Sequence, residues 1–251
     1  MKENTDRLSG LPDDIIQEIF SFLDMKVIVR TSILSKKWRN FWISFPNLYF
    51  LLGRSKVNKK TQRNYFTYFV NQVLLLRDTS DINKFRVSCY EGLHVSYIRT
   101  WLTFPLRRNI PEVHLQLKFP DSFKVPNEIF TSNIKVLRLQ QFGKSEVVMP
   151  TSLCSASKLK SLELVGFKLP KADSNGNVLL SCAVLENLII SDCGNHFKTL
   201  TISTPQLKSL ELDYRASNIS PHSTFPELHY NPNLRYRDNN SLKSTVEVIN
   251  P

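Results

Sequence analysis

Cysteine is scarce in this 251-residue sequence, and its four residues lie far apart, at positions 89, 154, 182 and 193. None of them belongs to a Cys-x-x-Cys pair, so the sequence offers neither a disulfide framework nor a zinc site. The five histidines also lack the His-Glu-x-x-His spacing of a zinc enzyme. We therefore expect buried thiols, no metal and no cofactor.

Catalytic motifs are missing as well. There is no Gly-x-Ser-x-Gly nucleophile turn. The Gly-Lys-Ser triplet at Gly143 looks like the end of a phosphate-binding loop, but the upstream glycine that such a loop needs would fall at Arg138. Cys193 lies near His196, yet it follows a strand-like run, which favours a structural thiol over a nucleophile. We predict a protein without catalytic residues.

Long apolar runs are also absent. The first ten residues are polar, and no stretch approaches the roughly 18 apolar residues of a membrane span. We expect a soluble protein of the nucleus, the cytoplasm or both, without a membrane partner. Acidic residues are the minority, and the net charge is +11. The densest basic run, Arg54–Arg63, has no interleaved aromatics to stack on bases, so a solvated linker is favoured over a nuclear-import or nucleic-acid patch.

The most informative segment is Asp6–Trp42, whose apolar spacing predicts three short amphipathic helices. Pro12 suits the opening of the first helix, and Asp24 and Ser35 suit the caps of the next two. The first helix carries an apolar stripe too wide for a small helical core, so part of it needs a partner. The apolar positions are Ile15, Ile16, Ile19, Phe20 and Leu23 in the first helix, Val27, Thr31 and Leu34 in the second, and Trp38, Phe41, Trp42 and Phe45 in the third.

Leu11-Pro12, the apolar helix after it, the run Val29–Trp38 and the trailing aromatics together resemble an F-box of the plant type. The resemblance implies a module that binds a Skp-type adaptor, which bridges to a cullin in a ubiquitin ligase. Each of these apolar residues could equally belong to the small core. The residues that the resemblance assigns to adaptor binding are Leu11, Pro12, Ile15, Ile16, Ile19, Leu23, Leu34 and Trp38.

The chain after residue 50 changes its pattern. From Tyr65 the apolar residues again have helical spacing, until Arg77 ends the run, and Ser96–Arg108 predicts another helix. Between and after them come short strand-like pieces with alternating apolar residues. These pieces begin at Phe85, Glu112, Ile134, Leu159, Leu185, Leu207 and Asn233, with an extra piece, TLTIS, at Thr199.

The strand-like pieces form an internal repeat. Equivalent leucines recur at intervals of roughly 22 to 26 residues, inside the range of leucine-rich repeats. We take Leu115, Leu137, Leu162, Leu188, Leu210 and Leu234 as equivalent. In such a repeat the leucines point into the core, and the residues between them face the concave side of a parallel sheet.

The F-box and the leucine repeats together resemble the plant F-box/leucine-rich-repeat family along most of the chain. The fold class expected is α+β or an α/β repeat: a three-helix F-box (1–50), a basic linker with a capping helix (51–80), and a short irregular leucine-rich-repeat solenoid with a parallel sheet on its concave face (81–251).

The family resemblance implies a substrate receptor of an SCF-type ubiquitin ligase, with a protein substrate held on the repeats. Two alternatives remain: a nucleic-acid-binding protein that uses Lys36, Lys37 and Arg39, and a repeat scaffold without ligase association. The apolar third helix argues against the first alternative, so we regard nucleic acid as an improbable partner. The candidate substrate-binding residues are His114, Gln116, Arg138, Gln140, Glu163, Ile189, Glu211, Asp213, Arg235 and Arg237.

Overall fold

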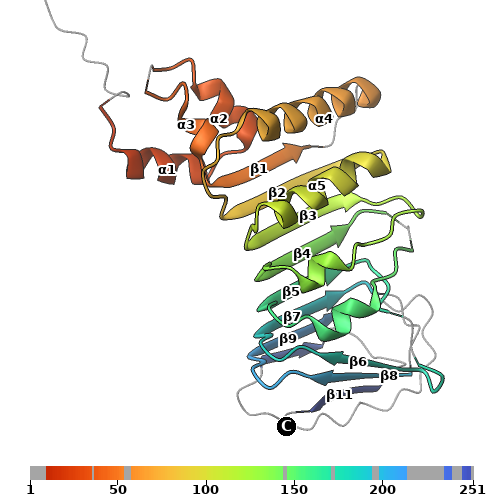
Figure 1. Cartoon of the computed structure of the whole chain (residues 1–251). Helices are drawn as coiled ribbons and strands as arrows, with labels where there is room; N and C mark the ends of the chain where they lie inside the picture. The colour runs from red at the N-terminus through yellow and green to blue at the C-terminus, as the bar shows by residue number, and fades with distance from the viewer. Residues whose placement is uncertain are drawn as a thin grey trace, which may run out of the picture. The chain divides into compact units, whose positions relative to one another are not determined.

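The computed structural model describes residues 10–35, 37–53, 58–143, 146–170, 173–193, 198–213, 235–238 and 245–249. The chain divides into two compact units, residues 1–91 and residues 92–251, which we call the first and the second unit. Figure 1 shows the helices and strands of both. In the described part of the chain, no helix combines the length and the apolar character needed to cross a membrane.

Three short helices open the first unit: α1 (Asp13–Ser21), α2 (Met25–Thr31) and α3 (Phe41–Ser44). Pro12 directly precedes α1, and its carbonyl accepts the backbone N–H of Ile16 at 3.1 Å. The predicted cap of α2 is confirmed, because the Asp24 carboxylate accepts the backbone N–H of Val27 at 3.0 Å. These contacts begin each helix where the sequence predicts it.

The predicted third helix is much shorter than expected. Ser35 does accept the backbone N–H of Trp38 at 3.1 Å, but the residues that follow form turns, and α3 spans only four residues. The aromatic side chains surround Phe20 of α1 instead of lining a regular helix. The ring of Phe20 meets Trp38, Phe41 and Phe45 edge-on, with centroids 5.5, 5.4 and 5.6 Å away. Aromatic packing at these distances therefore adds to the few turn-like backbone hydrogen bonds that hold this segment.

The rest of the first unit is a parallel strand pair with a helix. Strand β1 (Asn47–Leu52) pairs with β2 (Lys84–Gly92), and α4 (Lys59–Leu76) connects them. The predicted linker is only partly a linker, because the helix already begins at Lys59 after an Asn58 cap. Phe66, Val70 and Val73 of α4 are buried, so this helix covers the apolar strands, as its spacing predicts.

The second unit contains a parallel sheet in the order β3-β4-β5-β7-β9-β10. Its strands are β3 (Glu112–Lys118), β4 (Val136–Gln141), β5 (Ser161–Val165), β7 (Asn187–Ser191), β9 (Ser209–Asp213) and β10 (Arg235–Asp238). Every predicted repeat strand of this unit is present. Along the well-described strands the leucines are buried and the residues between them face the other side, which we call the open face.

The register corrects two of the six equivalent leucines. Leu137, Leu162, Leu188 and Leu210 lie side by side, as predicted. However, Val113 rather than Leu115 is aligned with Leu137, and Tyr236 rather than Leu234 is aligned with Leu210. Because the repeat accepts any apolar residue at these inward positions, counting leucines alone shifts the register by two at both ends.

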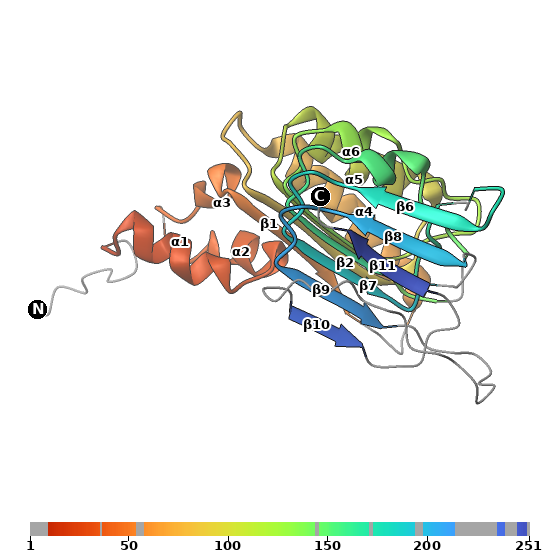
Figure 2. The same ribbon diagram turned by 90° about the horizontal axis from the view of Figure 1, so that it is seen from below.

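A second layer covers the buried face of this sheet. It consists of α5 (Val95–Arg107), α6 (Glu128–Thr131), the 3₁₀ turn η1 (Thr151–Ser155) and a parallel three-stranded sheet of β6 (Asn177–Ser181), β8 (Thr199–Ser203) and β11 (Thr245–Ile249). Figure 2 shows these elements on the same side of the larger sheet. The extra piece TLTIS is β8, so it belongs to the returning segments and does not interrupt the repeat.

Candidate functional site

The first unit leaves one face of α1 apolar and exposed. Ile16 and Phe20 point inward and are fully buried. On the other side, Ile15 and Ile19 are 40% and 37% exposed, and Phe22 just after the helix is 80% exposed. Spacings of four and three residues place these side chains along one helical face. The predicted excess of apolar surface on this helix is therefore present.

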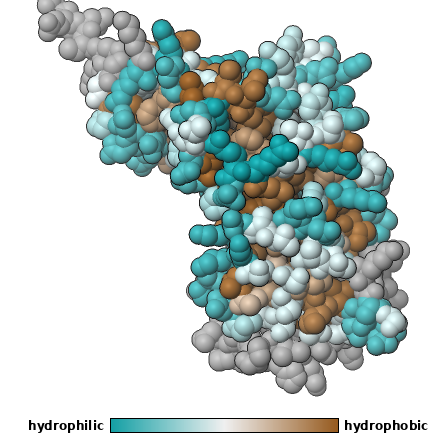
Figure 3. Space-filling model, viewed as in Figure 1, coloured by the Kyte–Doolittle hydropathy of each residue, from teal (hydrophilic) through white to brown (hydrophobic). Residues whose placement is uncertain are grey.

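Helix α2 and the turn after it add further apolar side chains. Val27 and Leu34 are exposed, and Ile33 is 86% exposed. We define the apolar docking surface as Ile15, Ile19, Phe22, Val27, Ile33 and Leu34. Figure 3 shows apolar side chains reaching the surface of this unit. Several exposed apolar residues within one small unit are typical of a protein-binding surface.

The eight residues assigned to adaptor binding fall into two groups. Leu11, Pro12, Ile15, Ile19, Leu23 and Leu34 are exposed or half-buried. Ile16 and Trp38 are buried, so they build the core and have no surface left for a partner. Sequence analysis missed Phe22, Val27 and Ile33, although Phe22 is seven residues beyond Ile15 and continues the same helical face.

The start of α1 is tied to the turn before α3 by a charged contact. Lys37 forms an ion pair with Asp13 at 2.8 Å and donates to the Leu11 carbonyl oxygen. This lysine is one of the three basic residues on which the nucleic-acid alternative depends. Because its ammonium group already neutralises a carboxylate, it has less charge to offer a phosphate. Lys36 lies outside the described residues.

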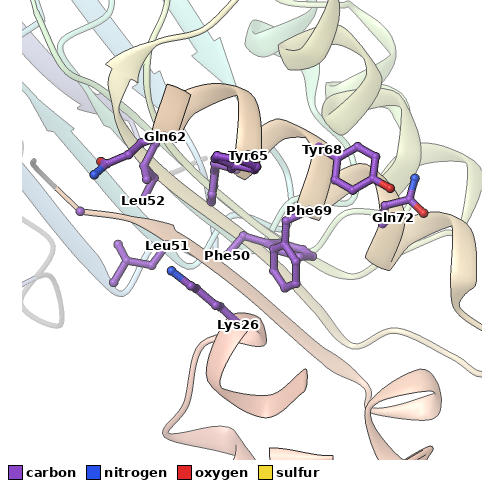
Figure 4. A pocket seen from close by; sticks show the side chains of 11 residues that line it. Lys26, Phe50, Leu51, Leu52, Gln62, Tyr65, Tyr68, Phe69 and Gln72 are labelled. Atoms are coloured by element: carbon purple, nitrogen blue, oxygen red, sulfur yellow. The ribbon is translucent and has the colours of Figure 1, made fainter. Parts of the chain in front are cut away.

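A groove of about 610 Å³ opens beside β1 in the first unit. Figure 4 shows Lys26 of α2 on one side of the strand and Tyr65, Tyr68 and Phe69 of α4 on the other. The lining includes no histidine, cysteine, aspartate or glutamate. Its titratable lining residues are Lys26, Tyr65 and Tyr68, and this lining places no carboxylate or imidazole beside them to act as a catalytic partner.

The open face of the second unit brings the predicted substrate-binding residues together. In the backbone register, His114, Arg138, Glu163, Ile189, Glu211 and Arg237 form one row across the sheet. Gln116, Gln140 and Asp213 belong to the next row along the strands, and Arg235 lies beside Ser209. The prediction of one shared face is confirmed at the level of strand positions.

Several of these side chains already contact each other. Arg138 Nε lies 3.5 Å from Glu163 Oε2, and Gln116 Nε2 donates to Gln140 Oε1 at 2.9 Å. His114 is only 7% exposed and lies 2.8 Å from Glu112, so it is a largely buried residue and not the accessible contact that the sequence suggests. Local pairing thus neutralises part of the charge on this face.

Three of the four cysteines are unsuited to nucleophilic chemistry. Cys89, Cys182 and Cys193 are buried, and burial raises the pKa of the first two thiols to about 11 and that of Cys193 to about 12. A thiol with such a pKa stays protonated at neutral pH. His196 lies outside the described residues. In the described part of the chain no group of three or more histidine, cysteine, aspartate or glutamate side chains is placed to hold a metal.

We expect thiol reagents to distinguish Cys154 from the other three cysteines. Cys154 is half-buried, so at pH 8 it should react with a disulfide reagent first, and the other three should react only as the protein unfolds. Because burial raises the folded-state pKa of these thiols, their contribution to stability is complete below pH 9 and decreases as the pH rises toward about 11. Thiol counting with and without denaturant measures the first effect. Equal reaction rates for all four thiols in the native protein would contradict it.

Comparison with known proteins agrees with this division into two units. An F-box domain model matches residues 8–50. A second model, described as FBD-associated F-box protein At5g56370, LRR repeats, matches residues 98–230, which is more than half of the chain. The chain belongs to the F-box/leucine-rich-repeat family.

Relatives of this F-box/leucine-rich-repeat chain occur in Arabidopsis thaliana. The chain is 28% identical over 241 residues to the F-box/LRR-repeat protein At4g14103, covering 92% of this chain and 61% of the relative. It is 27% identical over 208 residues to the FBD-associated F-box protein At3g52670, covering 82% of this chain and 48% of the relative. The chain thus spans about half to three fifths of the length of these relatives. No solved structure matches it.

Proposed function

We propose that this chain is the substrate-receptor subunit of an SCF-type ubiquitin ligase. The observation that carries the proposal is the apolar docking surface, which lies within the segment matched by the F-box model. In this proposal a Skp-type adaptor covers that surface and links the chain to a cullin. The receptor itself catalyses nothing and acts by holding a substrate near the conjugating enzyme, in the nucleus, the cytoplasm or both.

The physical basis of adaptor docking is burial of apolar side chains that the free chain leaves in water. Each side chain of the size of isoleucine or phenylalanine gains on the order of 1.5 to 3 kcal/mol when it becomes fully buried. Ile15, Ile19 and Phe22 start partly or largely exposed, so each has area left to lose. Polar neighbours such as Asp14 and Glu18 remain at the rim, where they influence association more than affinity.

We further propose that the leucine repeats stack as a solenoid whose open face is concave and holds the protein substrate. The rows of side chains offer glutamine, arginine and glutamate groups on rigid strands. The row also contains an apolar side chain, Ile189, between Glu163 and Glu211. A partner with charges of both signs suits this face better than a uniformly acidic polymer, because Glu163 and Glu211 would repel the latter.

A charge swap tests the substrate-binding face. Arg138→Glu combined with Glu163→Arg keeps an ion pair between β4 and β5 but reverses its direction, so stability should change by less than about 1 kcal/mol. Substrate capture should decrease, because the partner then meets the opposite charge at both positions. Quantitative mass spectrometry of captured proteins compares the swap with the parent chain. An identical set of captured proteins would exclude these two residues from recognition.

Co-expression of the full chain with a Skp-type adaptor tests the proposed function itself. We expect the two proteins to elute together from a size-exclusion column with equal stoichiometry. If the chain instead elutes without the adaptor but binds duplex DNA, the nucleic-acid alternative replaces the proposal. If it binds neither and still captures proteins through the repeats, it is a scaffold without ligase association.

A further inference from the structure

The strands of the second unit share a short motif at the edge where they begin. Two positions before the first residue of each of five strands lies a buried Ile or Leu, flanked by two outward residues. The buried residues are Ile110, Ile134, Leu159, Leu185 and Leu207. The flanking residues are Asn109 and Pro111, Asn133 and Lys135, Lys158 and Lys160, Val184 and Glu186, and Gln206 and Lys208.

Backbone hydrogen bonds hold these motifs in line. The N–H groups of Lys135, Lys160, Glu186 and Lys208 each donate to the carbonyl of the preceding motif, at 2.8 Å in all four cases. The flanking side chains therefore follow one another at the spacing of neighbouring strands, about 4.8 Å. Figure 3 shows hydrophilic side chains along this edge of the second unit.

The charges on this edge are strongly unbalanced. We define the basic edge as Lys135, Lys158, Lys160 and Lys208. The only acidic residue among the flanking positions is Glu186, whose carboxylate contacts Lys208 at 2.7 Å and Lys160 at 3.3 Å. These two hydrogen bonds lower the pKa of Glu186, so it stays ionised. One carboxylate cannot balance four ammonium groups, and three positive charges remain.

The excess charge gathers at the Lys135 end. Lys135 and Lys160 occupy the same position on neighbouring motifs, where like charges destabilise a sheet. Lys158 is held close by, because its ammonium group donates to Asn133 at 2.6 Å and Asn133 in turn donates to Asn109 at 3.1 Å. Lys135, Lys158 and Lys160 thus lie on adjacent motifs of one rigid backbone ladder. Lys160 already contacts Glu186, and the net positive charge of the group favours an anionic partner.

We propose that the basic edge binds an acidic peptide segment with several carboxylates. The proposal rests on the proposed function in that the segment belongs to the protein captured by the repeats. A peptide can place its carboxylates against Lys135, Lys158 and Lys160 and keep neutral residues at Glu186. A nucleic acid strand cannot omit its phosphates in this way, and none of the flanking residues is aromatic and able to stack on a base.

Fluorescence anisotropy with the full chain tests this proposal. The probe is a labelled peptide of alternating glutamate and serine, and its control is the same peptide with glutamine, both at low salt because screening weakens exposed charges. The triple variant Lys135→Gln, Lys158→Gln, Lys160→Gln should bind the acidic peptide about tenfold more weakly. The matched control Lys118→Gln, Lys124→Gln, Lys198→Gln removes the same charge from exposed lysines elsewhere in the unit and should bind like the parent chain.

The variant Glu186→Gln should change the affinity for the acidic peptide in the opposite direction. Removing this carboxylate frees Lys160 and Lys208, so the acidic peptide should bind several-fold more tightly. Equal weakening by both triple variants, or no tightening by Glu186→Gln, would overturn the proposal. Tighter binding of a single-stranded oligonucleotide through the same lysines would replace the peptide by nucleic acid. Co-elution with the Skp-type adaptor is measured on the same variants, so loss of peptide binding is distinguished from failure of the proposed function.

Discussion

Changing Ile15 and Ile19 together to aspartate should abolish binding of a Skp-type adaptor. Both side chains lie on the exposed face of α1, so in the free chain the new carboxylates remain hydrated and the first unit stays folded. In the complex they would enter an apolar contact without a partner, which costs far more than the lost methyl groups. We expect the dissociation constant to rise about 100-fold or more, roughly 3 kcal/mol.

The matched control places the same charges on another exposed apolar pair of the first unit. Leu75→Asp with Leu76→Asp changes the exposed end of α4, outside the segment matched by the F-box model. This control should bind the adaptor like the parent chain. Calorimetric titration gives the affinities, and circular dichroism shows that both variants remain folded. If the α1 variant is folded and binds the adaptor with normal affinity, the apolar docking surface is not the adaptor-binding site.

The second large effect concerns the inward leucines of the repeats. Leu162 and Leu210 are each 1% exposed and lie in register with Leu188 between them. Truncating either one to alanine leaves a cavity in the core of the second unit. We expect a loss of about 2 to 5 kcal/mol in the free energy of unfolding, measured by denaturant titration.

The neighbouring glutamates provide the control for this effect. Glu163 and Glu211 directly follow the two leucines and lie on the open face, half-buried instead of enclosed. Their alanine variants should change stability by less than about 1 kcal/mol, since a partly exposed ion pair contributes little. Similar losses for leucine and glutamate variants would contradict the alternation of buried and open positions.

Sequence periodicity was most informative where local rules decide the structure. The cap at Asp24 depends on a contact with Val27 three residues away, and the covering helix α4 follows directly from its apolar spacing. The third helix was predicted too long, for a tertiary reason. Its aromatic residues pack around Phe20, and this packing stabilises a turn that the sequence pattern cannot distinguish from a helix.

In the repeats, too, local sequence patterns predict the strands, whereas the pairing between strands depends on long-range contacts. Alternation identifies every strand of the larger sheet in the second unit, but the exact register depends on which apolar residues meet across strands, so Leu115 was aligned in place of Val113. The strand β6 lies within a segment that looks like a loop in sequence, because its partner β8 comes later in the chain. Such pairings have no signal in the strand itself.

The candidate sites were predictable as faces and less so as single residues. Helical spacing identifies the exposed face of α1, whereas Trp38 and Ile16 have the same apolar character and are buried. On the open face, contacts such as that between His114 and Glu112 within β3 decide which side chains remain accessible. The basic edge could not be predicted from the sequence, because its lysines belong to separate repeats. Backbone hydrogen bonds between the motifs bring these lysines side by side.

Hydrogen exchange of the full chain, measured with and without a Skp-type adaptor, tests the central claim most directly. The account predicts slower exchange in the amides of α1, α2 and the turn that contains Ile33 and Leu34, which carry the apolar docking surface. Strands β3, β4, β5, β7 and β9 should exchange at unchanged rates, because the proposal assigns their open face to the substrate. Protection confined to those strands, with no change in α1, would contradict the proposed division of adaptor and substrate binding between the two units.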